Sequence, residues 1–79
     1  MKDLLDYIVK SLVSKPEAVH IEETHNDNVV DLSLSVDPSD MGIVIGKAGQ
    51  TIKSIRKLLI TRAMAEQLKV NLNLQEVAQ

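Results

Sequence analysis

The sequence predicts an α+β fold with the element order α-β-β-α-α-β, in which three helices cover one face of a three-stranded mixed sheet. Apolar and polar residues alternate over Val30–Val36, which is the period-2 pattern of a strand with one buried face. Over Asp3–Val13 and Gln50–Gln67, apolar residues recur at helical spacing instead. A last alternating segment, Leu68–Leu74, follows two consecutive helices, so a right-handed crossover should place it parallel to the strand before them.

The first helix is expected from about Asp3 to Val13. Its apolar face consists of Leu5, Ile8, Val9 and Leu12. Asp3 and Asp6 suit the positive end of the helix dipole. Pro16 ends the helix, because proline has no N–H to donate and disfavours an α conformation in the residue before it.

A hairpin is expected next. Ala18–Thr24 forms its first strand, with Val19 and Ile21 facing inward. The turn at residues 26–28 reads Asn-Asp-Asn, and these residue types tolerate a positive φ. Val30–Val36 then pairs as the second strand.

The second half of the chain starts with a short helix that ends at Ile45. Asp37 is its expected N-cap, Pro38 takes the first helical position, and Asp40 lies three residues after the cap. The longest helix, Gln50–Gln67, has an inward face of Ile52, Ile55, Leu59 and Ala63. The final strand is expected to turn Val70, Leu72 and Leu74 inward, and Asn71 and Asn73 outward.

The joint between these two helices is a Gly-x-x-Gly turn, Gly46-Lys47-Ala48-Gly49. Two glycines let backbone N–H groups come within hydrogen-bonding distance of a phosphate, and Lys47 adds a positive charge. Glycine pairs at this spacing are common by chance, but here aliphatic residues flank the turn on both sides. The pattern therefore indicates a phosphate-binding loop set between two packed helices.

The run from Val44 to Ile52, together with the element order, resembles the type II KH domain and, among such proteins, the small bacterial single-KH-domain proteins of the KhpA family. The resemblance implies that the loop clamps about four single-stranded RNA nucleotides. The residues it assigns to RNA binding are Gly46, Lys47, Ala48, Gly49, Ile43, Val44, Ile45, Gln50, Ile52, Lys53 and Arg56. Residues around Leu32 and Leu34, with the link at residues 67–69, are expected near the opposite wall of the groove. The sequence leaves open which alternate side chains of Val30–Val36 face the bases, because it does not reveal the register of the strand.

The resemblance also implies partners: a homodimer, a heterodimer with a larger KH-containing protein of the Jag type, or both. It further implies an RNA chaperone role in post-transcriptional control, tied to cell elongation and envelope homeostasis. Ile60 and Met64 lie on the long helix, away from its inward face. They form either a dimer interface or the edge of a broad buried stripe.

Length and composition fit one domain, residues 1–79, with the KH core at about 29–76. The chain has no cysteine, so disulfides and thiolate metal sites are excluded. No signal peptide or membrane-spanning run is apparent, which predicts a cytoplasmic protein. The net charge of −2 is unevenly spread, since residues 1–40 carry −6 and residues 41–79 carry +4.

From residue 41 to residue 65, all charged residues are basic: Lys47, Lys53, Arg56, Lys57 and Arg62. This basic segment either faces a nucleic-acid backbone or forms an ordinary solvated helix face. Tyr7 is the only aromatic residue, so base stacking of the kind used by RRM and OB-fold proteins is not expected.

No enzyme, cofactor or metal site is predicted. A P-loop needs four residues between its glycines and a Ser or Thr after the lysine, whereas Gly42 and Gly46 enclose three and Ala48 follows Lys47. The cluster around His20, Glu22, Glu23 and His25 is expected to be an exposed polar edge strand. The remaining alternative is a protein–protein interaction module that binds little RNA itself, which the acidic net charge and the single loop lysine favour.

Overall fold

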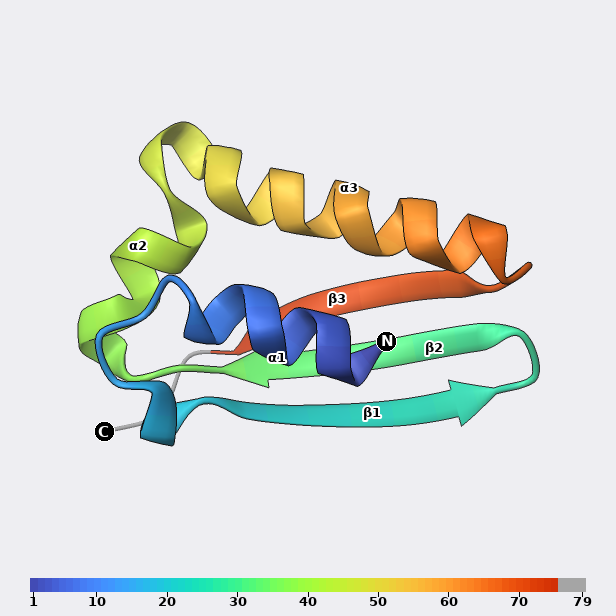
Figure 1. Ribbon diagram of the computed structural model, residues 1–79, viewed down its shortest axis with the longest axis horizontal. Helices are drawn as coiled ribbons and strands as arrows, with labels where there is room; N and C mark the ends of the chain where they lie inside the picture. Colours follow the sequence, from blue (N-terminus) through green and yellow to red (C-terminus); the bar gives the residue numbers. More distant parts are fainter. Residues whose placement is uncertain (76–79) are drawn as a thin grey trace.

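The computed structural model describes residues 1–75, and its element order is the predicted α-β-β-α-α-β (Figure 1). The helices and strands are α1 Lys2–Lys10, β1 His20–Asn26, β2 Val29–Ser35, α2 Met41–Ile45, α3 Gln50–Ala65 and β3 Lys69–Gln75. Short 3₁₀ turns occupy Pro16–Ala18, Pro38–Asp40 and Lys47–Gly49. The predicted domain extends to residue 79 and its core to about residue 76, and residues 76–79 lie outside the described part of the chain.

The three strands form one mixed sheet in the order β1-β2-β3, as predicted. β1 and β2 pair antiparallel, with Ile21 opposite Leu34. β2 and β3 pair parallel, with Leu32 opposite Leu72. Because side chains alternate along a strand, this register places the apolar residues of the three strands on one face, apart from Val29 at the start of β2, and leaves the other face mostly polar.

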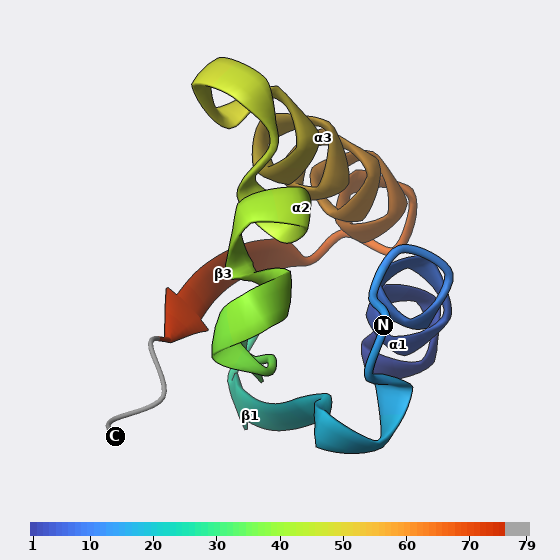
Figure 2. The same ribbon diagram turned by 90° about the vertical axis from the view of Figure 1, so that its left-hand side faces the viewer.

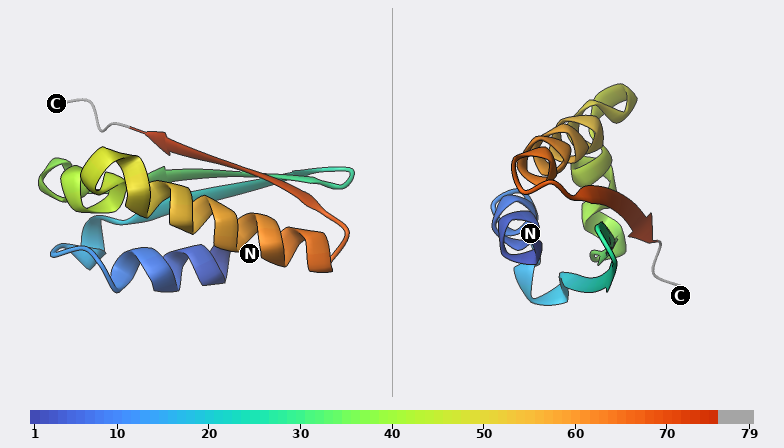
Figure 3. Two further views of the ribbon diagram at one scale, coloured as in Figure 1. Left: turned by 90° about the horizontal axis from the view of Figure 1, so that it is seen from above. Right: turned by 90° about the vertical axis from the view of Figure 1, so that its right-hand side faces the viewer.

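All three helices lie on the apolar face of the sheet, which confirms the predicted layers (Figure 2). Seen from above, α1 and α3 lie side by side beneath the strands (Figure 3). The central strand β2 is the most deeply covered, since Val30, Leu32 and Leu34 are fully buried. The predicted inward face of α3 is confirmed, with Ile52, Ile55, Leu59 and Ala63 all buried.

The first helix ends earlier than predicted, at Lys10 rather than Val13. The N–H of Leu12 donates to the Val9 carbonyl, an i→i−3 bond that tightens the chain into a turn. The Ser11 hydroxyl donates to the Tyr7 carbonyl and satisfies one of the last helical acceptors. The first strand begins two residues later than predicted, because Pro16–Ala18 forms a 3₁₀ turn.

The long helix also ends two residues early, at Ala65. Gln67 has a φ of 59°, its N–H donates to Met64 O, and the N–H of Leu68 donates to Ala63 O over 2.7 Å. These two bonds form a Schellman motif, which usually places glycine at the left-handed position. Glutamine occupies that position here, so sequence patterning did not reveal the helix end.

Candidate nucleic-acid interface

The glycine turn is the whole connection between α2 and α3, since α2 ends at Ile45 and α3 begins at Gln50. Three of its four residues have a positive φ: Gly46 at 77°, Ala48 at 55° and Gly49 at 74°. Ala48 is therefore held in the left-handed region, which costs an L-residue about 1–2 kcal/mol. The turn has one defined conformation that glycine makes accessible at two of its positions.

The two glycines are needed for different reasons. A Cβ added at Gly46 would overlap Thr51 Oγ1 and lie 2.7 Å from Thr51 Cβ and 2.9 Å from Thr51 N, closer than real Cβ atoms approach. A Cβ at Gly49 would meet nothing within 4 Å. Gly46 therefore allows the turn to pack on the first turn of α3, whereas Gly49 supplies backbone freedom and leaves open space beside it.

Two backbone N–H groups of the turn remain available to a ligand. Gly46 N–H donates to Gly42 O over 2.9 Å, and Gly49 N–H donates to Gly46 O over 3.1 Å. The N–H groups of Lys47 and Ala48 have no acceptor within residues 1–75. Both residues are exposed and lie just before the N-terminus of α3, where the helix dipole favours an anion.

The aliphatic residues assigned to RNA binding divide into two groups. Ile43 and Ile45 on α2 are exposed, so their side chains are accessible beside the loop. Val44 and Ile52 are buried in the core, because their positions on α2 and α3 face the other elements. These two residues hold the loop in place from beneath and are not accessible to a ligand. Gln50, the first residue of α3, is exposed next to the turn.

A cavity of about 380 Å³ lies between α3 and β3. It is lined by Asp31, Arg56, Leu59, Ile60, Val70, Asn71, Leu72 and Asn73. Within this lining, Arg56 Nη2 donates to the Leu72 carbonyl over 3.3 Å.

Leu32 and Leu34 themselves are buried under the helices, whereas their neighbour Asp31 on β2 lines the cavity. The other strand residues that line it belong to β3. The alternating pattern of β3 predicts that Asn71 and Asn73 face outward, but no local pattern reveals that they border a cavity, because that depends on the register of the strand.

Positive charge gathers along the exposed side of the loop and α3. Arg62 donates to Glu66 over 2.9 Å, an i→i+4 ion pair. Within the described chain, the other four basic residues of the segment form no ion pair. These four are Lys47, Lys53, Arg56 and Lys57, and all are exposed. They therefore offer an uncompensated positive surface from the loop along the first half of α3.

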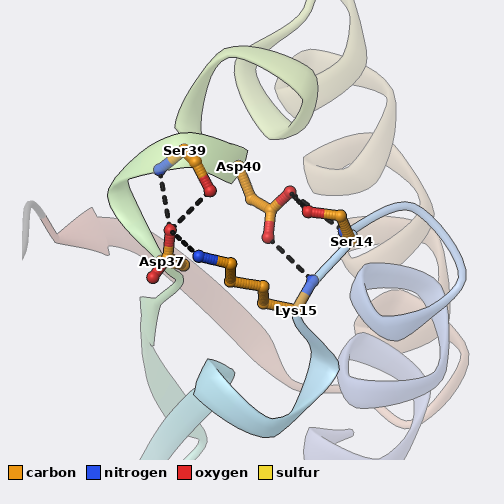
Figure 4. A network of polar contacts seen from close by, with 5 residues as sticks. All are labelled: Ser14, Lys15, Asp37, Ser39 and Asp40. Atoms are coloured by element: carbon orange, nitrogen blue, oxygen red, sulfur yellow. Dashed lines mark hydrogen bonds and ion pairs between the residues drawn. The ribbon is translucent and has the colours of Figure 1, made fainter.

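A buried carboxylate ties the segment after α1 to the start of α2 (Figure 4). Asp40 Oδ1 accepts from the N–H and the hydroxyl of Ser14, over 2.9 and 2.8 Å, and its Oδ2 accepts from Lys15 N–H over 3.1 Å. The bond from the Ser14 N–H, ahead of the others, holds the pKa of Asp40 below its ordinary value. The predicted cap at Asp37 is confirmed, since its carboxylate accepts from Ser39 N–H.

Hydrogen bonds join part of the polar cluster on β1 to the start of α1. Glu23 Oε1 lies 2.8 Å from His25 Nε2, and its Oε2 accepts from the Lys2 N–H at the start of α1. The hydrogen bond with His25 is the main cause that lowers the pKa of Glu23. No cluster of three or more candidate metal ligands occurs among residues 1–75. In the same range, no helix is long and apolar enough to cross a bilayer.

Residues 2–74 match the family described as KhpA/KhpB, KH domain. The chain is 47% identical over 76 residues to the RNA-binding protein KhpA of Chlamydia trachomatis, covering 96% of this chain and 97% of that protein. It is 47% identical over 70 residues to the RNA-binding protein KhpA of Clostridium perfringens, covering 89% and 93%. To the protein of that name from Halalkalibacterium halodurans it is 36% identical over 74 residues, covering 94% and 97%. The chain therefore belongs to the KhpA/KhpB family of KH domains.

Proposed function

We propose that this protein binds single-stranded RNA, with the loop Gly46–Gly49 on the sugar-phosphate backbone and the bases along the groove between α3 and β3. The observation that carries the proposal is the pair of unpartnered N–H groups at Lys47 and Ala48, beside the Lys47 ammonium. The relatives named RNA-binding protein KhpA support RNA as the ligand.

Different groups of the site would contact different parts of the RNA. The two free N–H groups and Lys47 hold a phosphate by hydrogen bonds and charge. Ile43 and Ile45 offer apolar contact beside the loop. The cavity at Arg56 lies seven residues along α3 from Gly49, or about 10 Å at 1.5 Å per residue. A strand held at the loop can therefore place a base one or two nucleotides further on in the cavity.

Binding should weaken with salt in proportion to the phosphates neutralised. If about three phosphates are contacted, log affinity falls against log salt with a slope of about −2, using about −0.7 per phosphate for a single strand. Lys53, Arg56 and Lys57 supply the additional charge along α3.

The test is RNA binding by a loop variant, Lys47→Asp with Ala48→Asp. Aspartate tolerates the left-handed conformation at position 48, so the variant should stay folded by circular dichroism. A control with the same change in charge, Lys2→Asp with Asn26→Asp, places the acids on exposed residues of α1 and β1. We expect the loop variant to lose binding at least tenfold and the control to stay within about threefold of the native chain. Equal binding by both variants would overturn the proposal.

We also propose a protein partner, either a second copy or a larger KH-containing protein of the Jag type. Ile60 and Met64 support this proposal, since they lie one turn apart on α3 with 47% and 71% of their surface exposed. Because Ile60 also lines the cavity, Met64→Asp is the cleaner probe. We expect it to shift sedimentation toward the monomer and leave RNA binding by the monomer intact. An unchanged sedimentation coefficient would remove Met64 from the interface.

With such a partner, the protein would act in the cytoplasm as an RNA chaperone in post-transcriptional control of cell elongation and envelope homeostasis. If instead the native chain dimerises and binds no RNA, the interaction module becomes the function.

A further inference from the structure

A carboxylate and an amide are joined at the edge of the cavity between α3 and β3. Asp31 of β2 and Asn71 of β3 are partners in the parallel register. Asn71 Nδ2 donates to Asp31 Oδ1 over 2.9 Å. Both residues line the cavity together with Arg56 and Asn73. The contact joins residues 40 positions apart, so it exists only in the folded sheet.

The negative charge of Asp31 would be unfavourable if the groove between α3 and β3 bound only phosphates. A carboxylate repels a phosphate, and Asp31 has no ion pair with Arg56 or any other residue in the described range to neutralise it. Arg56 donates to the Leu72 carbonyl instead. Asp31 therefore favours a ligand group that donates hydrogen bonds, and in RNA such groups belong to the bases and to the 2′-hydroxyl.

The hydrogen bond also fixes what Asn71 offers. An ionised carboxylate only accepts, so the Asn71 amide must turn its nitrogen toward Asp31. Its carbonyl oxygen is then free to accept, and so is the second oxygen of Asp31. The pair presents acceptors, which suit the exocyclic amino group of a base. Cytosine carries such a donor at its 4-position, where uracil carries a carbonyl that would face the carboxylate.

We propose that Asp31 and Asn71 form a base-selecting site that favours cytosine over uracil in the cavity between α3 and β3. The inference rests on the proposed RNA binding, because it assigns specificity to the same groove. The selected base lies one or two nucleotides from the phosphate held at the loop.

The test compares oligo(C) and oligo(U) ten-mers at pH 7 and one salt concentration. These RNAs differ in the amino or carbonyl group at the 4-position, together with the protonation of N3. The native chain should prefer oligo(C) about tenfold. Asp31→Asn keeps the shape and removes the charge, and it should lower the preference to about twofold. Asn71→Ala should also lower the preference for oligo(C). Because Asn71 is exposed, this variant can replace Asp31→Asn in the test if Asp31→Asn unfolds.

Glu22→Gln is the matched control. Glu22 is an exposed carboxylate on β1 that pairs with Ser33 of β2. It therefore lies on the same outward face of the sheet as Asp31, but it does not line the cavity. The loss of this negative charge in Glu22→Gln should raise the affinity for both RNAs equally, so the ratio of the oligo(C) affinity to the oligo(U) affinity should not change. A native chain that binds both RNAs without preference, or a preference unchanged in Asp31→Asn and Asn71→Ala, would overturn this inference alone. A native chain that binds neither RNA would overturn the proposed function with it.

Discussion

The replacement Gly46→Ala should damage the protein far more than Gly49→Ala, although both glycines have nearly the same φ. Gly46 combines a φ of 77° with a ψ of 172°, a region that only glycine populates freely. Gly49 lies in the ordinary left-handed region, with a ψ of 15°. The added Cβ at position 46 also overlaps Thr51, whereas at position 49 it meets open space.

The magnitudes follow from these two differences. Gly49→Ala should cost about 1–2 kcal/mol, the penalty of the left-handed conformation for an L-residue. Gly46→Ala should cost about 1–3 kcal/mol for its backbone conformation and a further 1–3 kcal/mol for the overlap. A domain of this size has a total free energy of unfolding of about 5 kcal/mol, so Gly46→Ala removes much or all of it.

Urea unfolding followed by circular dichroism measures both effects. With an m value of about 1 kcal/mol/M, the midpoint should fall by about 1–2 M for Gly49→Ala and by about 2–6 M for Gly46→Ala. Adding Thr51→Ala removes the overlap with Oγ1 and keeps the close contacts with Cβ and N, so it should recover only part of the loss. Equal midpoints for the two glycine variants would refute the steric role of Gly46.

Four further outcomes are expected. Leu59→Ala should cost about 2–5 kcal/mol in urea unfolding, because Leu59 is 1% exposed, whereas Leu58→Ala, at 55% exposure, should cost less than about 0.5 kcal/mol. Gln67→Gly should raise stability by about 1 kcal/mol by relieving the left-handed residue at the end of α3, and a lower urea midpoint would contradict that reading. The pKa of Asp40 is lowered, so its carboxylate contributes fully to the free energy of unfolding above the ordinary pKa of 3.8, and this contribution is lost as the pH falls below that value. The difference in the free energy of unfolding between the native chain and Asp40→Asn should therefore be full at pH 7 and become smaller toward pH 3, as urea unfolding at each pH would measure. Arg56→Gln should make the log–log salt slope of RNA binding shallower by about 0.7, and an unchanged slope would place Arg56 away from phosphate.

Most of the fold could be predicted because a helix or strand that is buried on one face has apolar residues at regular intervals in its sequence. Val30, Leu32 and Leu34 alternate along β2, and the structure buries all three. The ends of α1 and α3 could not be predicted in the same way. They depend on hydrogen bonds at Ser11 and Gln67, residue types that also occur within helices.

The site was predictable only where it is local in sequence. The glycine turn could be recognised from neighbouring residues, but the contact between Gly46 and Thr51 depends on how α3 leaves the turn. Asp31 and Asn71 meet because β2 and β3 pair in one parallel register, which no local pattern encodes. The sequence shows that Asp40 lies three residues after the Asp37 cap, but not that its carboxylate accepts hydrogen bonds from Ser14 and Lys15, which are 25 or more positions away.

Contact between the free N–H groups of the loop and the RNA backbone can be observed residue by residue. The measurement is a titration of the ¹⁵N-labelled chain with a single-stranded RNA ten-mer, followed by the amide chemical shifts. We expect the Lys47 and Ala48 amides to shift most and residues along the α3–β3 cavity to follow. Amides of α1 and β1 should hardly move. Shifts confined to α1 and β1, with Lys47 and Ala48 unmoved at saturation, would show that the loop does not hold the RNA.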